Sequence, residues 1–292
     1  MTRILDCTIR DGGYVNNWDF SDDCVLATFL TAQRSKVEYF EVGYRKKSAT
    51  RKFEKITDDK LTFLEEFKNN KTKLLVMVNE LEYDSTLFND ADKSPVDGVR
   101  VACHVPEIET GMKICEELYD RGYEVFLNIM HIPQIEQKHY DLLANWDRKN
   151  ILTSIYFADS YGVLVPENIK DYFDKFKAVG FDNVSVHTHN NLQMAFANSL
   201  QAINCGAYAV DATVYGMGRG GGNLPIELLV GYLRENSPEY YMNLVEKYYL
   251  PIYNKNSWGY SIPSLISGLK DIHPNKTHGL NMDFVQMWKA DL

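Results

Sequence analysis

Short apolar runs rich in β-branched and aromatic residues alternate with amphipathic segments along most of this chain. We predict strands at residues 3–8, 39–43, 73–78, 98–102, 124–130, 153–158, 183–187 and 208–214. Their length and composition are typical of buried strands. The segments between them are long enough for helices, so the pattern predicts a repeated strand–helix unit.

Three of the intervening segments carry apolar residues at helical spacing. These sets are Ile108, Met112, Cys115 and Tyr119; Leu192, Phe196, Leu200 and Ile203; and Ile169, Phe173 and Phe176. Steps of three and four residues place each set on one face of a helix, which we expect to pack on the sheet. Pro166 suits the first turn of the third helix.

The number and spacing of the units indicate the fold class. Eight units over residues 1–235 correspond to roughly 30 residues each, which is typical of a (β/α)8 TIM barrel. The alternative is a doubly wound open sheet with a helical appendage, but the first strand is not followed by GxGxxG. We therefore predict a barrel domain at 1–235 and a helical extension at 236–292, rich in aromatic residues. The sequence leaves open whether this extension covers the barrel or binds a second copy in a homodimer.

Composition and charge narrow the class of partner. The chain has 292 residues, of which 45% are hydrophobic and 24% charged, as in a soluble globular protein. Its net charge of −9 argues against nucleic acid as a partner, since phosphate contacts need clustered Lys and Arg. The stretch from Val184 to Val210 lacks Asp, Glu, Lys and Arg, but polar residues fill its first half, so we expect no membrane span.

The cysteines and the first residues bear on the compartment. The five cysteines are scattered and odd in number, without a CxxC pair: Cys7, Cys24, Cys103, Cys115 and Cys205. This pattern favours reduced thiols over a disulfide framework or a zinc site. The opening "MTRILDCTIRDGG" has no apolar run of the kind that a secretion signal needs. We therefore expect a cytoplasmic protein.

The first chemical signal is "HTH" at the end of the seventh predicted strand. His187 and His189 are two residues apart, so on a strand both imidazoles point to the same side. Two neutral imidazoles and a carboxylate suit a divalent metal. The plainer interpretation is a pair of histidines satisfied by hydrogen bonds in the core or at the surface. Asp11 at the same barrel mouth favours the metal.

Arg10 and Asp11 follow the first predicted strand and precede a glycine pair. We expect a loop in which Gly12 and Gly13 free the backbone, so that both side chains turn toward one ligand. Asp11 would then bind the ion, and Arg10 would bind negative charge on the substrate. The alternative is a structural Arg–Asp pair at the barrel rim.

The run "GMGRGGGN" at residues 216–223 follows the eighth predicted strand. Its composition resembles a phosphate-binding loop, although glycines also occur where backbone packs closely. Asn223 at its end either caps the next helix or supplies an amide oxygen to a metal.

Three motifs together resemble a known superfamily. "DCTIRDGG", "HTHNN" and "GMGRGGGN" are similar to those of the DRE-TIM metallolyases, a group of pyruvate aldolases and acyl-CoA lyases and synthases. Within it the chain looks most like the 4-hydroxy-2-oxovalerate aldolases. "EVGY" (41–44), "RVACHVPE" (100–107) and "ADSYGVLVPE" (158–167) add to the resemblance, which covers residues 3 to about 230.

The resemblance implies a (β/α)8 barrel with a divalent cation, Mn²⁺ or Mg²⁺ first and Zn²⁺ as a further candidate. It implies that Asp11, His187 and His189 bind the metal, that Asn223 is a possible fourth ligand, and that Arg10 stabilises an enolate. The substrates would be a 2-oxo acid such as pyruvate and an aldehyde.

This chain departs from the aldolase pattern in the position of the base. Tyr14 stands where the resemblance implies a base histidine, and a phenol has an ordinary pKa near 10. We therefore add His104 and Tyr260 to Tyr14 as catalytic candidates. Glu41 and Ser160, at strand ends within the matching motifs, are candidates for substrate binding.

The leading hypothesis is a metal-dependent pyruvate aldolase. A second is an acyl-CoA-dependent synthase or lyase of the same superfamily, although residues 216–222 lack the cysteine of hydroxymethylglutaryl-CoA lyases. A third is a barrel that only binds a partner. We predict no partner dehydrogenase, because the chain need not carry the full docking region of the catabolic aldolases.

Overall fold

The computed structural model describes residues 2–69, 71–233, 238–278, 280 and 282–290. Eight parallel strands close into a barrel in chain order. They are β1 (Arg3–Asp6), β2 (Tyr39–Tyr44), β3 (Lys73–Asn79), β4 (Gly98–His104), β5 (Glu124–Met130), β6 (Leu152–Asp159), β7 (Val184–Thr188) and β8 (Ala209–Ala212). All eight predicted strands are thus confirmed, and the closed order excludes the open doubly wound sheet.

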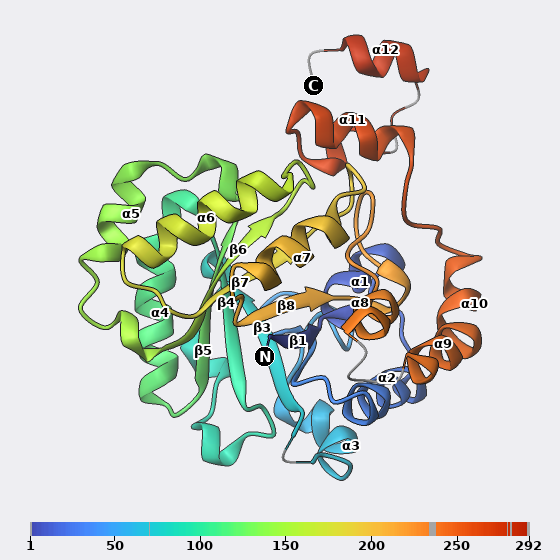
Figure 1. Ribbon diagram of the computed structural model, residues 1–292. Coiled ribbons are helices and arrows are strands. Elements are labelled where there is room, and N and C mark those ends of the chain that lie inside the picture. The colour runs from blue at the N-terminus through green and yellow to red at the C-terminus, as the bar shows by residue number, and fades with distance from the viewer. Residues whose placement is uncertain (1, 70, 234–237, 279, 281, 291–292) are drawn as a thin grey trace.

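Helices surround the barrel and continue past it (Figure 1). They are α1 (Thr8–Asn16), α2 (Asp22–Arg34), α3 (Thr62–Glu65), α4 (Ile108–Asp120), α5 (Gln137–Ala144), α6 (Pro166–Ala178), α7 (Ala195–Asn204), α8 (Ile226–Leu233), α9 (Glu239–Leu244), α10 (Leu250–Tyr253), α11 (Ile262–Lys270) and α12 (Phe284–Lys289). None of these described helices is long and apolar enough to cross a membrane. The expected division of the chain at residues 235 and 236 lies outside the described residues.

The helical periodicity predicts the buried face well in α6 and poorly in α7. In α6 the predicted stripe of Ile169, Phe173 and Phe176 is fully buried. In α7 the fully buried residues are the small and polar ones, among them Ala195 and Ala202, whereas Phe196 and Ile203 of the predicted stripe are only half-buried against the core. The small side chains let this helix lie close to the barrel. Tyr119 at the end of α4 is also exposed, contrary to the predicted stripe.

The period-two alternation of the strands separates two kinds of interior. Alternate side chains point outward into the apolar layer beneath the helices, and the others point into the barrel. Near the N-terminal ends the inner set is apolar and aromatic, and includes Leu5, Tyr39, Phe126 and Tyr156. Above that layer the inner positions are charged or polar, and these form the site.

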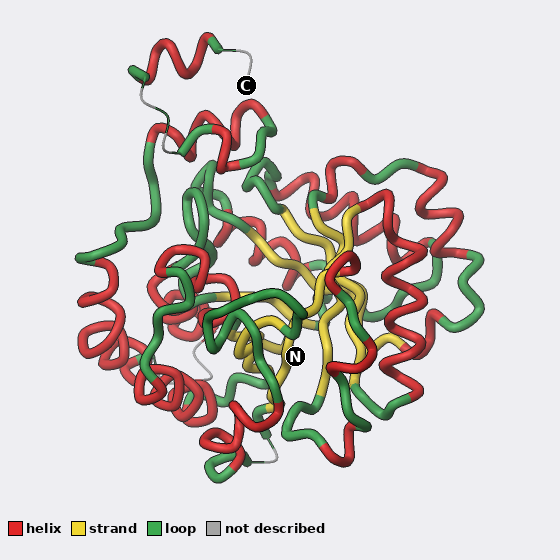
Figure 2. Tube along the Cα trace, turned by 180° about the vertical axis from the view of Figure 1, so that it is seen from behind, coloured by secondary structure: helices red, strands yellow, loops and turns green. Residues whose placement is uncertain are grey.

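The extension packs on two different parts of the barrel (Figures 1 and 2). Its first part lies against α2, where the Tyr249 hydroxyl hydrogen-bonds with Thr28 Oγ1 at 2.8 Å. Tyr241, at the start of the same part, donates to the buried Asp6 carboxylate at 3.0 Å. The second part, α11 and the residues after it, lies at the barrel mouth, where Gly268 approaches the β7–α7 loop.

Candidate metal centre and active site

The C-terminal ends of the strands surround a cavity of about 170 Å³. Most of the side chains proposed from the sequence line it: Arg10, Asp11, Tyr14, His104, Ser160, His187 and His189. This volume is below the roughly 300–1,000 Å³ of sites for drug-sized ligands. The cavity therefore suits small metabolites.

The other three proposed side chains, all within the described part of the chain, lie elsewhere. Glu41 is fully buried beneath the cavity, between Arg10 and Arg100. We therefore correct its expected role from substrate binding to holding Arg10. Tyr260 is 59% exposed in the segment between α10 and α11 and does not reach the cavity wall, so its expected catalytic role gains no support. Asn223 lies behind Asp11.

Arg10 and Asp11 lie in a helix rather than in the expected loop. Strand β1 ends at Asp6, whose carboxylate accepts a hydrogen bond from the Thr8 N–H at 2.9 Å. Helix α1 therefore begins directly at the strand end, and its first turns carry Arg10 and Asp11 into the barrel mouth. The prediction of a loop at this point is wrong.

The glycine pair in α1 allows close packing and not a turn. A Cβ atom on Gly12 would lie 2.8 Å from Met217 Sδ, and one on Gly13 would lie 2.1 Å from Trp18 Nε1. Cβ atoms essentially never make such short contacts, so a larger residue at either position would displace the Met217 or Trp18 side chain or shift α1. The glycines thus fix the depth at which the helix places its Arg–Asp pair.

Asp11, His187 and His189 form a group whose ligand atoms all lie within 4.8 Å of one another. The Nε2 atoms of the two histidines are 3.2 Å apart. Two nitrogens at about 2.1 Å from one ion and at right angles to each other would be about 3 Å apart. The same distance also fits a hydrogen bond between the rings, so the carboxylate beside them is what favours a cation. The group fits a divalent metal.

The charge states of this group are those that bind metals. Burial by itself raises the pKa of Asp11, but the Arg10 guanidinium and the two imidazoles lower it more, to below the usual range. Burial lowers the pKa of His189 to about 3, although the Asp11 carboxylate acts in the opposite direction. At neutral pH the group therefore offers a carboxylate and a neutral imidazole, without a proton to displace.

Asn223 approaches the group through Asp11. Its Nδ2 donates to Asp11 Oδ2 at 2.6 Å and to the Met217 carbonyl at 3.0 Å. Its Oδ1 is buried and has no hydrogen-bond partner among the described residues. A buried amide oxygen without a donor is uncommon and is a ligand that hard cations accept. Asn223 therefore fits a fourth ligand better than a helix cap, since α8 begins only at Ile226.

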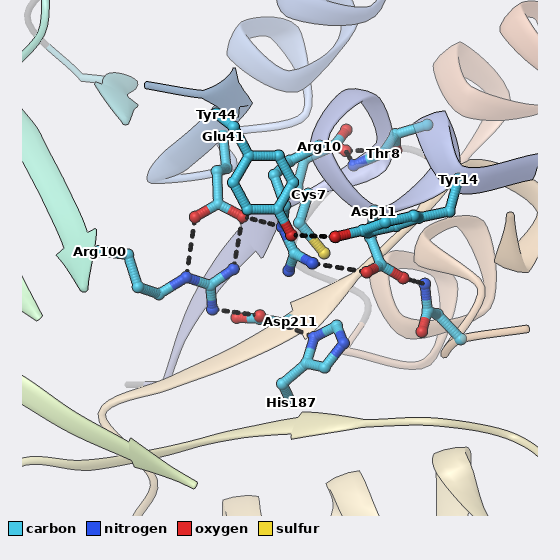
Figure 3. Close-up of polar contacts among 12 residues, drawn as sticks. Cys7, Thr8, Arg10, Asp11, Tyr14, Glu41, Tyr44, Arg100, His187 and Asp211 are labelled. Carbon is cyan, nitrogen blue, oxygen red and sulfur yellow. Dashed lines mark hydrogen bonds and ion pairs between the residues drawn. The ribbon is translucent and has the colours of Figure 1, made fainter. Parts of the chain in front are cut away.

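The buried Asp211 carboxylate orients the His187 ring on the side away from His189 (Figure 3). His187 Nδ1 lies 2.9 Å from Asp211 Oδ2, and the Asp211 carboxylate also pairs with Arg100. Burial raises the pKa of Asp211, but the Arg100 guanidinium and His187 lower it below its ordinary value. An ionised carboxylate accepts the Nδ1–H, which leaves the Nε2 lone pair free for a metal.

A second arm of the same network holds Arg10. Arg100 donates to both oxygens of Glu41, at 2.8 and 2.6 Å, and Glu41 also accepts from Arg10 Nε at 2.6 Å. Arg10 in turn contacts Asp11 at 2.5 Å. Figure 3 shows these side chains as one connected series from Asp11 to Asp211. The orientation of the metal group and of Arg10 thus depends on one buried arginine.

The sequence reasoning missed Arg100 and Asp211, although a signal was present. Each is a charge in the middle of an apolar strand, in "GVRVA" and "YAVDATV". A charge at such a position is buried only when it is paired, so two of opposite sign indicate an internal ion pair. The cavity residues Tyr44, His131, Tyr161, Arg219 and His273 were also missed. Tyr44 is the last residue of β2, and the other four lie on loops and in the extension.

Two candidate bases line the cavity in different surroundings. The Tyr14 hydroxyl lies 2.9 Å from that of Tyr44. Burial is the main cause that raises the pKa of Tyr44 well above its ordinary value, and the neighbouring Tyr14 is the second. The Tyr44 hydroxyl therefore stays protonated. His104 instead places Nδ1 2.6 Å from Glu80 Oε1, while more than half of its ring is exposed. Glu80 would orient the ring so that Nε2 is free to take a proton.

Known proteins are similar to this chain in sequence and in fold. Residues 133–247 match the HMGL-like family. A 4-hydroxy-2-oxovalerate aldolase from Carboxydothermus hydrogenoformans is 30% identical over 79% of this chain and 70% of its own length. An oxaloacetate decarboxylase from Mycobacterium tuberculosis is 28% identical over 79% of this chain and 69% of its own.

Solved structures agree with the fold. The N-terminal domain of a candidate aldolase from Bacteroides vulgatus superposes with a TM-score of 0.84 at 29% identity, over 94% of this chain and 95% of that one. The carboxyl transferase domain of Rhizobium etli pyruvate carboxylase shares the fold with a TM-score of 0.71 at 16% identity. The fold and the sequence together define a TIM barrel of the HMGL-like class. The chain belongs to the HMGL-like (DRE-TIM) family, as its three motifs predict.

Proposed function

We propose that this protein is a divalent-metal-dependent aldolase, which joins the enolate of a 2-oxo acid such as pyruvate to an aldehyde or reverses that reaction. The observation that carries the proposal is the convergence of Asp11, His187 and His189 in one small cavity. Mn²⁺ or Mg²⁺ is the expected cation, with Zn²⁺ as a third candidate. When bound, the cation supplies Lewis-acid stabilisation of the charge that develops on the oxo acid.

The reaction needs one proton removed and one delivered. In the condensation a base takes a proton from C3 of pyruvate, C3 forms a bond to the aldehyde carbon, and the aldehyde oxygen takes up a proton. The product is a 4-hydroxy-2-oxo acid, and cleavage is the same series reversed. Arg10, held by Glu41 and Asp11, would donate hydrogen bonds to the oxygen on which the negative charge develops.

We assign the proton transfer at C3 to His104, because Glu80 orients its ring and the ring borders the cavity. We expect His104→Gln to slow exchange of the pyruvate C3 protons with D2O roughly 100-fold, within the range for loss of a general base. Tyr14→Phe is the comparison, and a larger loss in that variant would move the assignment to Tyr14. The exchange is followed by proton NMR.

The proposal as a whole is tested by the same exchange with and without metal. We expect exchange with Mn²⁺ or Mg²⁺, its loss on chelation, and condensation when an aldehyde is added. We expect His189→Ala to abolish exchange and tight metal binding, because one of the ligands is lost. His139→Ala is the matched control, since His139 lies on α5 and does not line the cavity. If the protein shows no exchange and no turnover with any aldehyde, it is not an aldolase.

Three other functions remain as alternatives with their own tests. The relative named oxaloacetate decarboxylase favours a decarboxylase that passes through the same enolate, and release of CO2 from oxaloacetate would show it. An acyl-CoA-dependent synthase would release a free thiol from acetyl-CoA. A barrel that only binds a partner would hold no metal at all.

A further inference from the structure

The cavity carries a second group of positive and hydrogen-bonding side chains that the metal site does not use. Arg219 from the glycine-rich loop, His131 after β5 and His273 after α11 all line it. His131 is paired, since its Nε2 lies 3.0 Å from Asp271 Oδ1. Within the described chain, no carboxylate lies within ion-pairing distance of Arg219. The Asp11 carboxylate acts on Arg219 only from beyond ion-pairing distance, so the guanidinium is available to pair with a negative charge on a ligand.

Arg219 is held in an orientation suited to an anion. Its guanidinium carbon lies over the Tyr14 ring, 4.1 Å from the ring centre, in a cation–π contact. Among residues 2–69, 71–233, 238–278, 280 and 282–290, none accepts a hydrogen bond from the Arg219 side chain, and its planar fork matches carboxylate or phosphate oxygens. The loop itself is fixed, because Gly221 donates to Asn191 Oδ1 at 2.9 Å.

His273 adds a donor from the C-terminal extension. Its Nδ1 accepts the Asn275 N–H at 3.1 Å, which places the ring proton on Nε2. The ring packs on Tyr161, which packs in turn on His131. Burial lowers the pKa of His273, and the positive charges of Arg219 and His131 lower it further. The His273 ring is therefore neutral near pH 7, and an anion between it and Arg219 would accept its Nε2–H while lying beside the guanidinium charge.

We propose that Arg219 and His273 bind a carboxylate or phosphate group at the end of the aldehyde substrate remote from its carbonyl. This inference rests on the proposed aldolase function and names its substrate class, an anionic aldehyde. Because one cavity of about 170 Å³ holds this group and the metal ligands, the aldehyde is a short molecule. Simple neutral aldehydes such as acetaldehyde would leave Arg219 without a partner.

The test compares matched aldehydes in condensation with pyruvate by the full chain supplied with Mn²⁺ or Mg²⁺. The pairs are D-glyceraldehyde 3-phosphate with D-glyceraldehyde, and succinic semialdehyde with butanal. We expect the anionic member of at least one pair to have a kcat/KM about 10- to 100-fold higher, as a charge-assisted hydrogen bond allows. The pair that shows the preference identifies phosphate or carboxylate. No preference in either pair would overturn the inference.

The variant that tests the assignment is Arg219→Gln, which should lower the anionic-to-neutral ratio of kcat/KM at least 10-fold. Lys276→Gln is the matched control, since it removes a nearby exposed positive charge that does not line the cavity, and it should leave the ratio unchanged. His273→Leu should lower the ratio by a smaller factor. If Arg219→Gln raises KM for pyruvate and keeps the ratio, Arg219 binds the oxo acid and the inference is wrong.

A failure of the aldolase proposal is distinguishable from a failure of this inference. Exchange of the pyruvate C3 protons needs no aldehyde and tests the aldolase proposal. The anion site is tested by calorimetry with and without Mg²⁺, which compares binding of sn-glycerol 3-phosphate with glycerol and of butyrate with butanol. We expect tighter binding of an anionic member, lost in Arg219→Gln. Equal binding within both pairs, or equal binding by protein and variant, would overturn the site.

Discussion

His187 is held at both of its ring nitrogens, on one side by Asp211 and on the other by the ligand group it shares with His189. A strand supplies the direction of such a side chain, but the tautomer depends on the carboxylate behind it. At the scale of single residues, the side chains that face the cavity are therefore oriented by a buried network of ion pairs. The buried Arg100 joins the two carboxylates of that network, Asp211 and Glu41.

We expect Asp211→Asn to lower metal affinity roughly 10- to 100-fold, since loss of the carboxylate weakens control over the His187 tautomer. The measurement is competition with a chelator of known affinity. Asp174→Asn is the control, because Asp174 forms only an exposed pair with Lys170 on α6. We expect the variant to fold, because Arg100 keeps its ion pair with Glu41. Circular dichroism checks this before the affinities are compared. Unchanged affinity in a folded protein would exclude the positioning role of Asp211.

At the scale of elements, helix α1 could not be predicted from the pattern of hydrophobic and polar residues. It starts one residue after β1 and carries two adjacent glycines, which disfavour helices by about 1 kcal/mol each. Contacts with Met217 and Trp18 leave no room for larger residues, so packing overrides the helix propensity. The arrangement places Arg10 and Asp11 on a rigid element.

We expect Gly13→Ala to lower the free energy of unfolding by roughly 1–3 kcal/mol, because the added methyl group displaces the Trp18 ring. Gly231→Ala in α8 is the matched control. Among the described residues, a Cβ there meets Pro238 at ordinary distances, so we expect a gain of about 0.5–1 kcal/mol. Urea unfolding measures both. Equal effects of the two substitutions would show that helix propensity alone decides.

At the scale of the whole molecule, closure of the barrel brings the two ends of its sequence together. Strand β1 pairs with β8 at Asp6 and Ala212, so the elements that follow β1, β7 and β8 meet at one mouth. The extension then returns to this mouth and adds His273 to the cavity. Its expected role in a homodimer remains a prediction.

The stability of the molecule should depend on pH through Asp159, at the end of β6. Burial raises its pKa from 3.8 to about 7, although backbone N–H groups of Val163 and Leu164 act against this. Between pH 4 and 7 the folded state keeps a proton that the unfolded state releases, so this carboxyl lowers stability as the pH rises through that range. The contribution is of the order of a few kcal/mol.

We therefore expect the difference in unfolding free energy between the protein and Asp159→Asn to shift in favour of the variant from pH 4 to pH 7. The amide oxygen of asparagine still accepts the two backbone hydrogen bonds, so the comparison isolates the proton. Urea unfolding at three pH values measures it. A difference that stays constant with pH would mean that Asp159 keeps its ordinary pKa.

The sequence by itself determined the barrel, because eight buried strands at regular spacing leave few other ways to cover both faces of a parallel sheet. It also placed His187 and His189 on one side of a strand, since alternation fixes which strand side chains share a side, whereas Asp11 was proposed from its position after the first strand and lies in α1. Only the tertiary structure decided what stands behind and opposite them. The pairing of Arg100 with Glu41 and Asp211, and the position of His273 beside Arg219, join residues more than 50 positions apart. Local pattern carries no information about such contacts, because the closure of the barrel and the path of the extension create them.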